Sequence, residues 1–177
     1  MDERDRGVVV DASPLIVLAK LQRLWLLNDL YGVVLICPAV KRETLDAGRA
    51  VHARGVEQIE TALEDGWLRQ ARLTADERDM AQRLIGRARL GPGESESIAV
   101  ANARRLRLII DDKEARNVAA AARVEHLGTA GTLLEAHLRK RLDFEELEAA
   151  LRDLSHVLWL SPAVVVEMLR LAREAKR

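Results

Sequence analysis

The sequence predicts an α/β protein: a three-layer α/β/α sandwich around a mainly parallel sheet, with additional C-terminal helices. Three short apolar runs without alternation, at 8–10, 33–37 and 106–110, are typical of parallel strands buried on both faces. Stretches with helical spacing of leucine and alanine separate these runs. Strand and helix signals therefore alternate up to about residue 140, as they do in parallel sheets covered by helices.

Local start and stop signals give the expected elements. Pro14 and Pro38 can each open a helix, and Gly32 interrupts a leucine-rich helical pattern. Thr74 and Glu77 have the spacing of a capping box, in which each side chain accepts a hydrogen bond from the backbone of the other. The expected elements are a further short strand at 124–127 and helices at 15–30, 38–47, 51–64, 75–89, 94–106, 113–124, 129–140, 143–155 and 162–175.

The pattern is helical only from Asp143 onward, so we expect a domain at 1–142 and a C-terminal helical extension at 143–177. Apolar residues of the extension recur mostly at steps of three and four, as in helices that bury one stripe. Two interpretations are open. The stripe packs on its own domain, or it serves association with a partner.

Composition excludes several classes of protein. Lys and Arg total 28 and Asp and Glu total 28, so the chain lacks the global positive field of a nonspecific nucleic-acid binder. The single cysteine, Cys37, excludes an internal disulfide and fits a reducing compartment. No stretch reaches the roughly 20 apolar residues of a membrane helix, and the charged start is unlike a signal peptide. We therefore expect a cytoplasmic protein with no membrane segment.

Acidic residues directly follow two of the predicted strands. Asp11 ends the first, and the pair Asp111 and Asp112 follows the third. Ligands of open α/β sheets gather at the carboxyl ends of the strands, and carboxylates that converge there repel unless they share a cation. Oxygen ligands suit Mg²⁺ or Mn²⁺, whereas none of the 4 histidines has zinc-ligand spacing to another His or Cys.

A plainer interpretation applies to the same acids. An Asp after a strand is often a helix cap or a turn residue. Glu94 and Glu96 stand where first-turn acids favour the helix dipole, and Glu43 is a helical glutamate that nothing local marks out. Spacing alone therefore does not assign these residues to a site.

Five segments between residues 8 and 137, in this order, resemble the PIN-domain superfamily, and within it the DUF3368 branch, which is akin to nuclease toxins of toxin–antitoxin pairs. They are VVVDASPLIVLAKLQRLWLL, VVLICPAVKRETL, LGPGESESIAVANA, LRLIIDDKEARNVA and LGTAGTLLEAH. The resemblance implies a PIN-like nuclease domain and a metal-dependent endoribonuclease that hydrolyses RNA phosphodiester bonds with Mg²⁺ or Mn²⁺.

Carried over by position, the resemblance implies that Asp11, Glu43, Glu96 and Asp112 hold the metal and form the catalytic site. The third acid is commonly Asp in the superfamily and is Glu96 here. Ile110 stands where Ser or Thr is frequent, so one polar contact is absent.

Two further residues are candidates for substrate binding. Ser13 stands where many relatives carry Asn, which keeps a hydrogen-bonding group near the first acid. Arg116, just past the last acid, is a candidate for a phosphate contact.

Neighbouring acids compete for two of these positions. Strand alternation sends Asp111 and Asp112 to opposite sides, and Glu94 and Glu96 lie some 200 degrees apart on an ideal helix. In each pair only one side chain can face the site easily. The resemblance selects Asp112 and Glu96, which leaves Glu94 as a solvated first-turn acid.

The implied partners are RNA, a small antitoxin protein and a second copy of the chain. We expect a homodimer because the leucines of 15–30 and the amphipathic extension offer more apolar surface than a small sheet covers. The main alternative is a catalytically silent PIN-fold binding or regulatory module, because fold alone does not establish function. A receiver-like domain would place its acid pair after the first strand, and a haloacid-type phosphatase would need an Asp at position 13, which is Ser.

Overall fold

The structure is a computed structural model that describes residues 7–46, 55–158 and 160–175. Its centre is a five-stranded, all-parallel sheet in the order β3-β2-β1-β4-β5. The strands are β1 (Val8–Val10), β2 (Val34–Ile36), β3 (Leu68–Gln70), β4 (Arg107–Ile109) and β5 (His126–Leu127). The predicted parallel sheet is confirmed.

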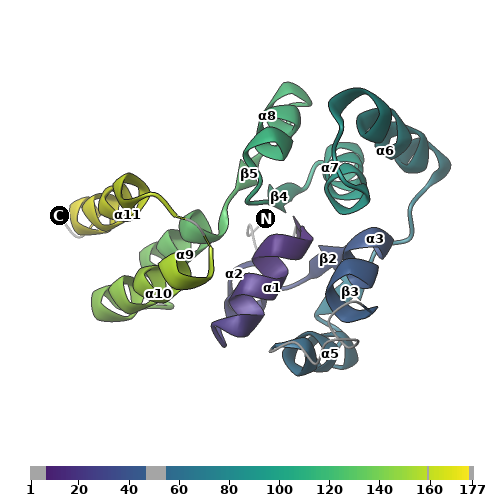
Figure 1. Cartoon of the computed structure of the whole chain (residues 1–177). Helices are drawn as coiled ribbons and strands as arrows, with labels where there is room; N and C mark the ends of the chain where they lie inside the picture. Colours follow the sequence, from purple (N-terminus) through teal and green to yellow (C-terminus); the bar gives the residue numbers. More distant parts are fainter. Residues whose placement is uncertain (1–6, 47–54, 159, 176–177) are drawn as a thin grey trace.

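Helices cover both faces of this sheet. Figure 1 shows α1, α2 and α5 on one side of the strands and α6, α7 and α8 on the other, which confirms the predicted sandwich. The helices are α1 (Ala12–Lys20), α2 (Trp25–Tyr31), α3 (Pro38–Lys41), α5 (Val56–Glu64), α6 (Ala75–Ala88), α7 (Pro92–Arg104), α8 (Lys113–Ala121), α9 (Thr129–Leu138), α10 (Phe144–Val157) and α11 (Pro162–Glu174). A π-helical turn, η2 (Arg42–Asp46), continues α3.

The middle strands are apolar on both faces because helices cover both. Val8, Val9 and Val10 are each 0% exposed. Val9 of β1 is paired with Leu35 of β2 and with Leu108 of β4. The backbone N–H of Asp11 donates to the carbonyl of Ile109 over 3.0 Å, so β1 and β4 end at the same level. The residues that follow these two strands are therefore neighbours.

Two elements differ from the sequence-based expectation. The single helix expected over 15–30 is two helices, because the chain turns between Lys20 and Trp25 with Gln22 at a positive φ of 56°. Strand β3 was not predicted, because it is an edge strand in which only Leu68 is buried and it carries no apolar run. The first part of the helix expected over 51–64 lies outside the described residues, and α5 begins at Val56.

The C-terminal helices fold onto the rest of the chain. Helix α10 contacts α9 and buries Leu147, Leu151 and Leu154 completely, as part of the continuous core. Helix α11 also contacts α9 but buries only Ala172, and Val166 remains 66% exposed. The stripe on α10 thus packs on its own chain.

None of the helices in the described ranges has the length and apolar character needed to cross a membrane.

Candidate active site

Asp11 is the most deeply buried acid at the carboxyl edge of the sheet. It follows β1 at the start of α1 and is only 5% exposed. Its Oδ1 is buried and has no hydrogen-bond partner among the described residues. Burial first, and then the charges of Glu94, Glu43 and Asp111, raise the pKa of Asp11 to about 7, although the backbone N–H of Ala12 lowers it. Such a carboxylate has the environment that a bound cation would relieve.

Glu43 lies against the first turn of α7. It belongs to η2, and its Oε1 accepts a hydrogen bond of 3.2 Å from the backbone N–H of Gly93. A Cβ at Gly93 would lie 2.6 Å from Glu43 Oε2, so this approach requires glycine. The pKa of Glu43 is raised mainly by desolvation, lowered by the Gly93 N–H, and raised by the charge of Glu94.

Glu94 and Glu96 both act as helix caps, in two different helices. Glu94 Oε2 accepts from the backbone N–H of Gly91 over 2.9 Å at the start of α7. Glu96 Oε2 accepts from the backbone N–H of Ala39 over 2.8 Å in the first turn of α3. Glu94 is not simply solvated, because it is half-buried and its charge acts on Asp11 and Glu43.

Asp111 and Asp112 point to different partners. The backbone N–H and the hydroxyl of Thr129 donate to Asp111 over 2.8 and 2.7 Å, and the hydroxyl of Ser13 lies 3.5 Å from it. Asp112 is exposed and caps α8, where it accepts from the backbone N–H of Ala115 over 2.8 Å. The two side chains diverge, as strand alternation predicts. The charge of Asp111 contributes to the raised pKa of Asp11.

Arg116 lies beside the Asp111 carboxylate. A Cβ at Gly128 would lie 3.2 Å from Asp111 Oδ1 and 3.3 Å from Arg116 Nη1, so both polar groups cover this glycine. Arg116 is half-buried on α8. The positively charged guanidinium of Arg116 thus lies at the edge of the acidic site.

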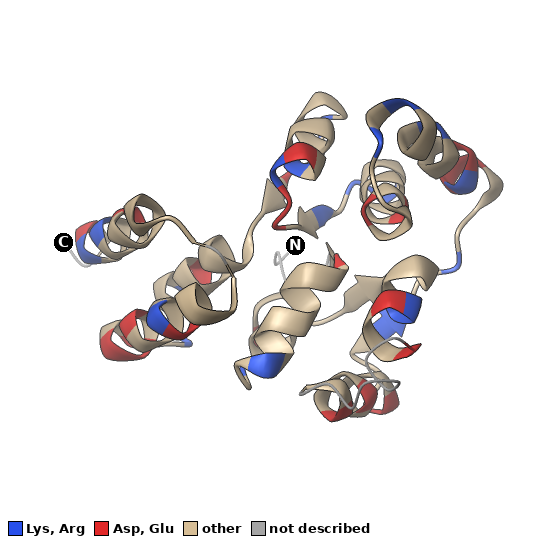
Figure 2. Ribbon diagram, in the orientation of Figure 1, with Lys and Arg blue, Asp and Glu red and all other residues tan. Residues whose placement is uncertain are grey.

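The acids come from four separate parts of the chain that meet at one edge of the sheet. In Figure 2 red positions on α7, on the β4–α8 connection and next to α3 lie around the start of α1. We define the acidic cluster as Asp11, Glu43, Glu94 and Asp111, the carboxylates coupled by charge to Asp11.

The donor chemistry of the acidic cluster fits a hard divalent ion. All its ligand atoms are carboxylate oxygens, and one of them, Asp11 Oδ1, is buried without a partner among the described residues. Within residues 7–46, 55–158 and 160–175, no three His, Cys, Asp or Glu side chains already converge closely enough to hold an ion. Binding of an ion would therefore require the carboxylates to move closer together.

A family model described as a PIN domain, DUF3368, matches residues 7–174. The chain belongs to the PIN-domain family. This confirms the predicted family, and the match includes both C-terminal helices. No curated protein and no solved structure matches the chain. PIN domains are typically nucleases and generally use divalent metal ions.

In this PIN domain the four predicted acids are placed differently. Asp11 and Glu43 lie in the acidic cluster, whereas Asp112 caps α8 and Glu96 accepts from the first turn of α3, with its charge acting on Glu43. The neighbouring acids Asp111 and Glu94 also act on Asp11, and Glu94 caps α7. Thr129 was missed by sequence reasoning, because its contact with Asp111 joins residues 18 positions apart. The one available signal was its place two residues after the end of β5, at the same edge of the sheet.

Proposed function

We propose that this PIN-domain protein is an endoribonuclease that hydrolyses RNA phosphodiester bonds with Mg²⁺ or Mn²⁺ and serves as the toxin of a toxin–antitoxin pair. The observation that carries the proposal is Asp11, a buried carboxylate with an unpartnered oxygen among the described residues and three charged neighbours. This arrangement stabilises a bound cation and costs free energy without one.

Asp11 and Glu43 would hold the ion in this proposal. Asp111 is favoured over Asp112 as a further ligand, because Thr129 fixes its carboxylate on the side of Ser13. Glu94 is favoured over Glu96, since the charge of Glu94 raises the pKa of Asp11 and raises that of Glu43 more than the charge of Glu96 does. A divalent ion bound there supplies an activated water and stabilises charge on the attacked phosphate. Arg116 would bind a phosphate oxygen beside it.

A cleavage assay tests the proposal. The purified chain should cleave single-stranded RNA with Mg²⁺ or Mn²⁺, and EDTA should stop cleavage. Asp11→Asn should lower the rate at least about 100-fold, because it removes the central charge. Asp79→Asn is a matched control, because Asp79 is exposed on α6 outside the acidic cluster. Cleavage that survives EDTA, or an Asp11→Asn variant as fast as the control, rejects the metal mechanism.

The second candidate is a silent PIN module that binds RNA or a partner without cutting. RNA binding without cleavage in either metal would select it. The toxin role has its own test: a small protein encoded beside this chain should bind it and suppress cleavage. A chain whose cleavage no such partner suppresses would be a ribonuclease of another role.

A further inference from the structure

A cavity of about 550 Å³ adjoins the acidic cluster at the open edge of β5. Asp111 lines this cavity and also belongs to the cluster, so the two sites are continuous. The volume lies within the range of sites for nucleotide-sized ligands, about 300 to 1,000 Å³. One wall of the cavity is formed by the C-terminal part of the chain, which contributes no residue to the acidic cluster.

One end of the cavity is cationic. Lys113 and Arg116 of α8 line it next to Asp111. Arg116 lies next to Gly128, as the Asp111 carboxylate does, and both residues line the cavity. Two cations at this end of the cavity fit an anionic group that enters from the acidic cluster, such as a phosphate.

The rest of the cavity lining is mostly apolar, with His126 and Ser161 as its polar members. Leu127 contributes from β5, and Leu158 and Leu160 contribute from the α10–α11 connection. Val164 and Met168 stand one helical turn apart on α11 and complete the wall. Val164 is 36% exposed and the other four are half-buried, so this wall is open to a ligand.

We propose that this cavity binds a base of the RNA strand next to the cleaved bond, with Lys113 and Arg116 on its phosphate and the α11 wall against the face of the base. A nucleotide is the ligand class that combines an anionic group with a flat, largely apolar ring within this volume. The inference rests on the proposed ribonuclease function, and it gives α11 the role of setting base preference.

Nucleotide binding without metal tests the inference. The full chain in EDTA is titrated with adenosine 5′-monophosphate, uridine 5′-monophosphate and ribose 5-phosphate, and affinity is measured by calorimetry. At least one nucleotide should bind about tenfold more tightly than ribose 5-phosphate, because only the nucleotide fills the apolar part. Equal affinity for both nucleotides and ribose 5-phosphate overturns the inference, whether or not any variant folds.

A matched pair of variants on α11 locates the binding. Val164→Asp places a charge in the cavity wall, whereas Val166→Asp makes the same change at a more exposed position that does not line the cavity. Val164→Asp should lower the affinity for the preferred nucleotide about tenfold and leave ribose 5-phosphate unaffected. Val166→Asp should match the unmodified chain. Equal nucleotide affinity in the two variants overturns the inference.

Other results separate this inference from the proposed function. If nucleotide binding depends on the base but RNA is not cleaved, the base site is supported and the proposed ribonuclease function is rejected. If cleavage depends on metal but Val164→Asp has the same base preference as the unmodified chain, the ribonuclease function is supported and the base site is rejected. If Val164→Asp instead changes the mass by light scattering and leaves nucleotide affinity unchanged, the wall is an interface between copies and the inference is overturned.

Discussion

Burial and like charge act together on one carboxylate, Asp11. Desolvation is the main reason for its raised pKa, and three neighbouring acids add to it. The other acids of the edge are each held by backbone N–H groups that orient them: Gly93 for Glu43, Gly91 for Glu94 and Thr129 for Asp111. The site thus contains one desolvated carboxylate, Asp11, and three carboxylates that hydrogen bonds from the backbone orient.

The adjacent pair Asp111 and Asp112 gives the sharpest prediction at the residue scale. Asp111→Asn should lower RNA cleavage on the order of 100-fold, because it removes the negative charge of a proposed metal ligand. Asp112→Asn should stay within about threefold, because Asn caps a helix as well as Asp does. Initial rates at saturating Mn²⁺ measure both. The reverse ranking would make Asp112 the ligand, as the family resemblance implies.

Gly93 tests whether Glu43 must approach α7. In Gly93→Ala the added Cβ would displace the Glu43 carboxylate, which lies at the end of a flexible side chain. Metal affinity, measured as the rise in melting temperature with Mn²⁺, should fall about 10- to 100-fold, while the free energy of unfolding without metal stays the same or rises by up to about 1 kcal/mol. Gly86→Ala on α6, where a Cβ meets nothing within 4 Å, is the control. Equal metal affinity in both variants would show that Glu43 does not bind the ion.

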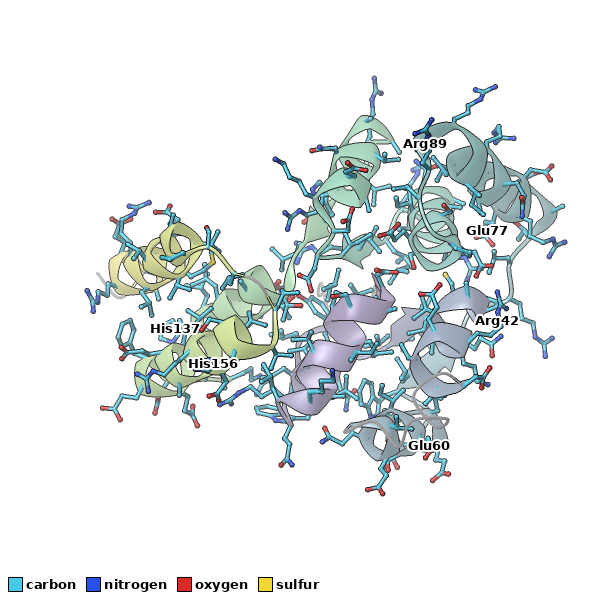
Figure 3. The ribbon with its side chains drawn as sticks, in the orientation of Figure 1. Arg42, Glu60, Glu77, Arg89, His137 and His156 are labelled. Carbon is cyan, nitrogen blue, oxygen red and sulfur yellow. The ribbon has the colours of Figure 1, made fainter. Side chains whose placement is uncertain are left out.

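At the scale of elements, α7 is the helix on which the site depends, because its first turn orients Glu43 and carries Glu94. Helix α6 holds it in place. The buried Glu77 of α6 accepts from Arg104 of α7 over 2.7 and 3.0 Å, and Figure 3 labels Glu77 on α6. Glu77 also closes the predicted capping box with Thr74, which is confirmed.

The Glu77–Arg104 pair gives a prediction on pH. The hydrogen bonds from Arg104, against the effect of burial, hold the pKa of Glu77 below its usual value. Its ionised form therefore stabilises the fold at neutral pH, and this stability is lost as pH falls through the lowered pKa. Glu77→Gln, which keeps a capping acceptor, should cost about 1.5 to 3 kcal/mol at pH 7 and progressively less toward pH 3. Urea unfolding at several pH values measures the difference. A cost that does not change with pH would mean that the charge of Glu77 contributes nothing.

At the scale of the whole molecule, the C-terminal helices belong to the same core as the sheet. The leucines expected to drive dimerisation are used within the chain, since Leu15, Leu18, Leu27 and Leu30 are each 0% exposed. A homodimer remains a prediction. Any interface would use other apolar surface, such as Trp25, which is 44% exposed on α2.

Two truncations test how the extension contributes to stability. A chain that ends at Arg141 loses three completely buried leucines of α10, each contributing about 1.5 to 3 kcal/mol, which is comparable to the stability of a whole domain. It should aggregate or unfold. A chain that ends at Leu158 loses α11, which buries only Ala172, and should stay folded. Circular dichroism and cooperative urea unfolding distinguish the two. If the chain that ends at Arg141 is soluble and unfolds cooperatively, the fold does not need the extension, and the interpretation that it serves association is favoured.

The sequence alone determined the parallel sheet, most of its helices and the edge at which acids gather. These features follow from local patterns: the unalternating run at 8–10, the capping box at Thr74, and Asp11 directly after a strand. Only the tertiary structure shows which groups orient Asp111 and Glu96. These two side chains have partners far along the chain, Thr129 for Asp111 and Ala39 for Glu96, which no local pattern reveals. Edge strand β3 escaped prediction for a related reason, because backbone pairing with β2 and not an apolar run makes it a strand.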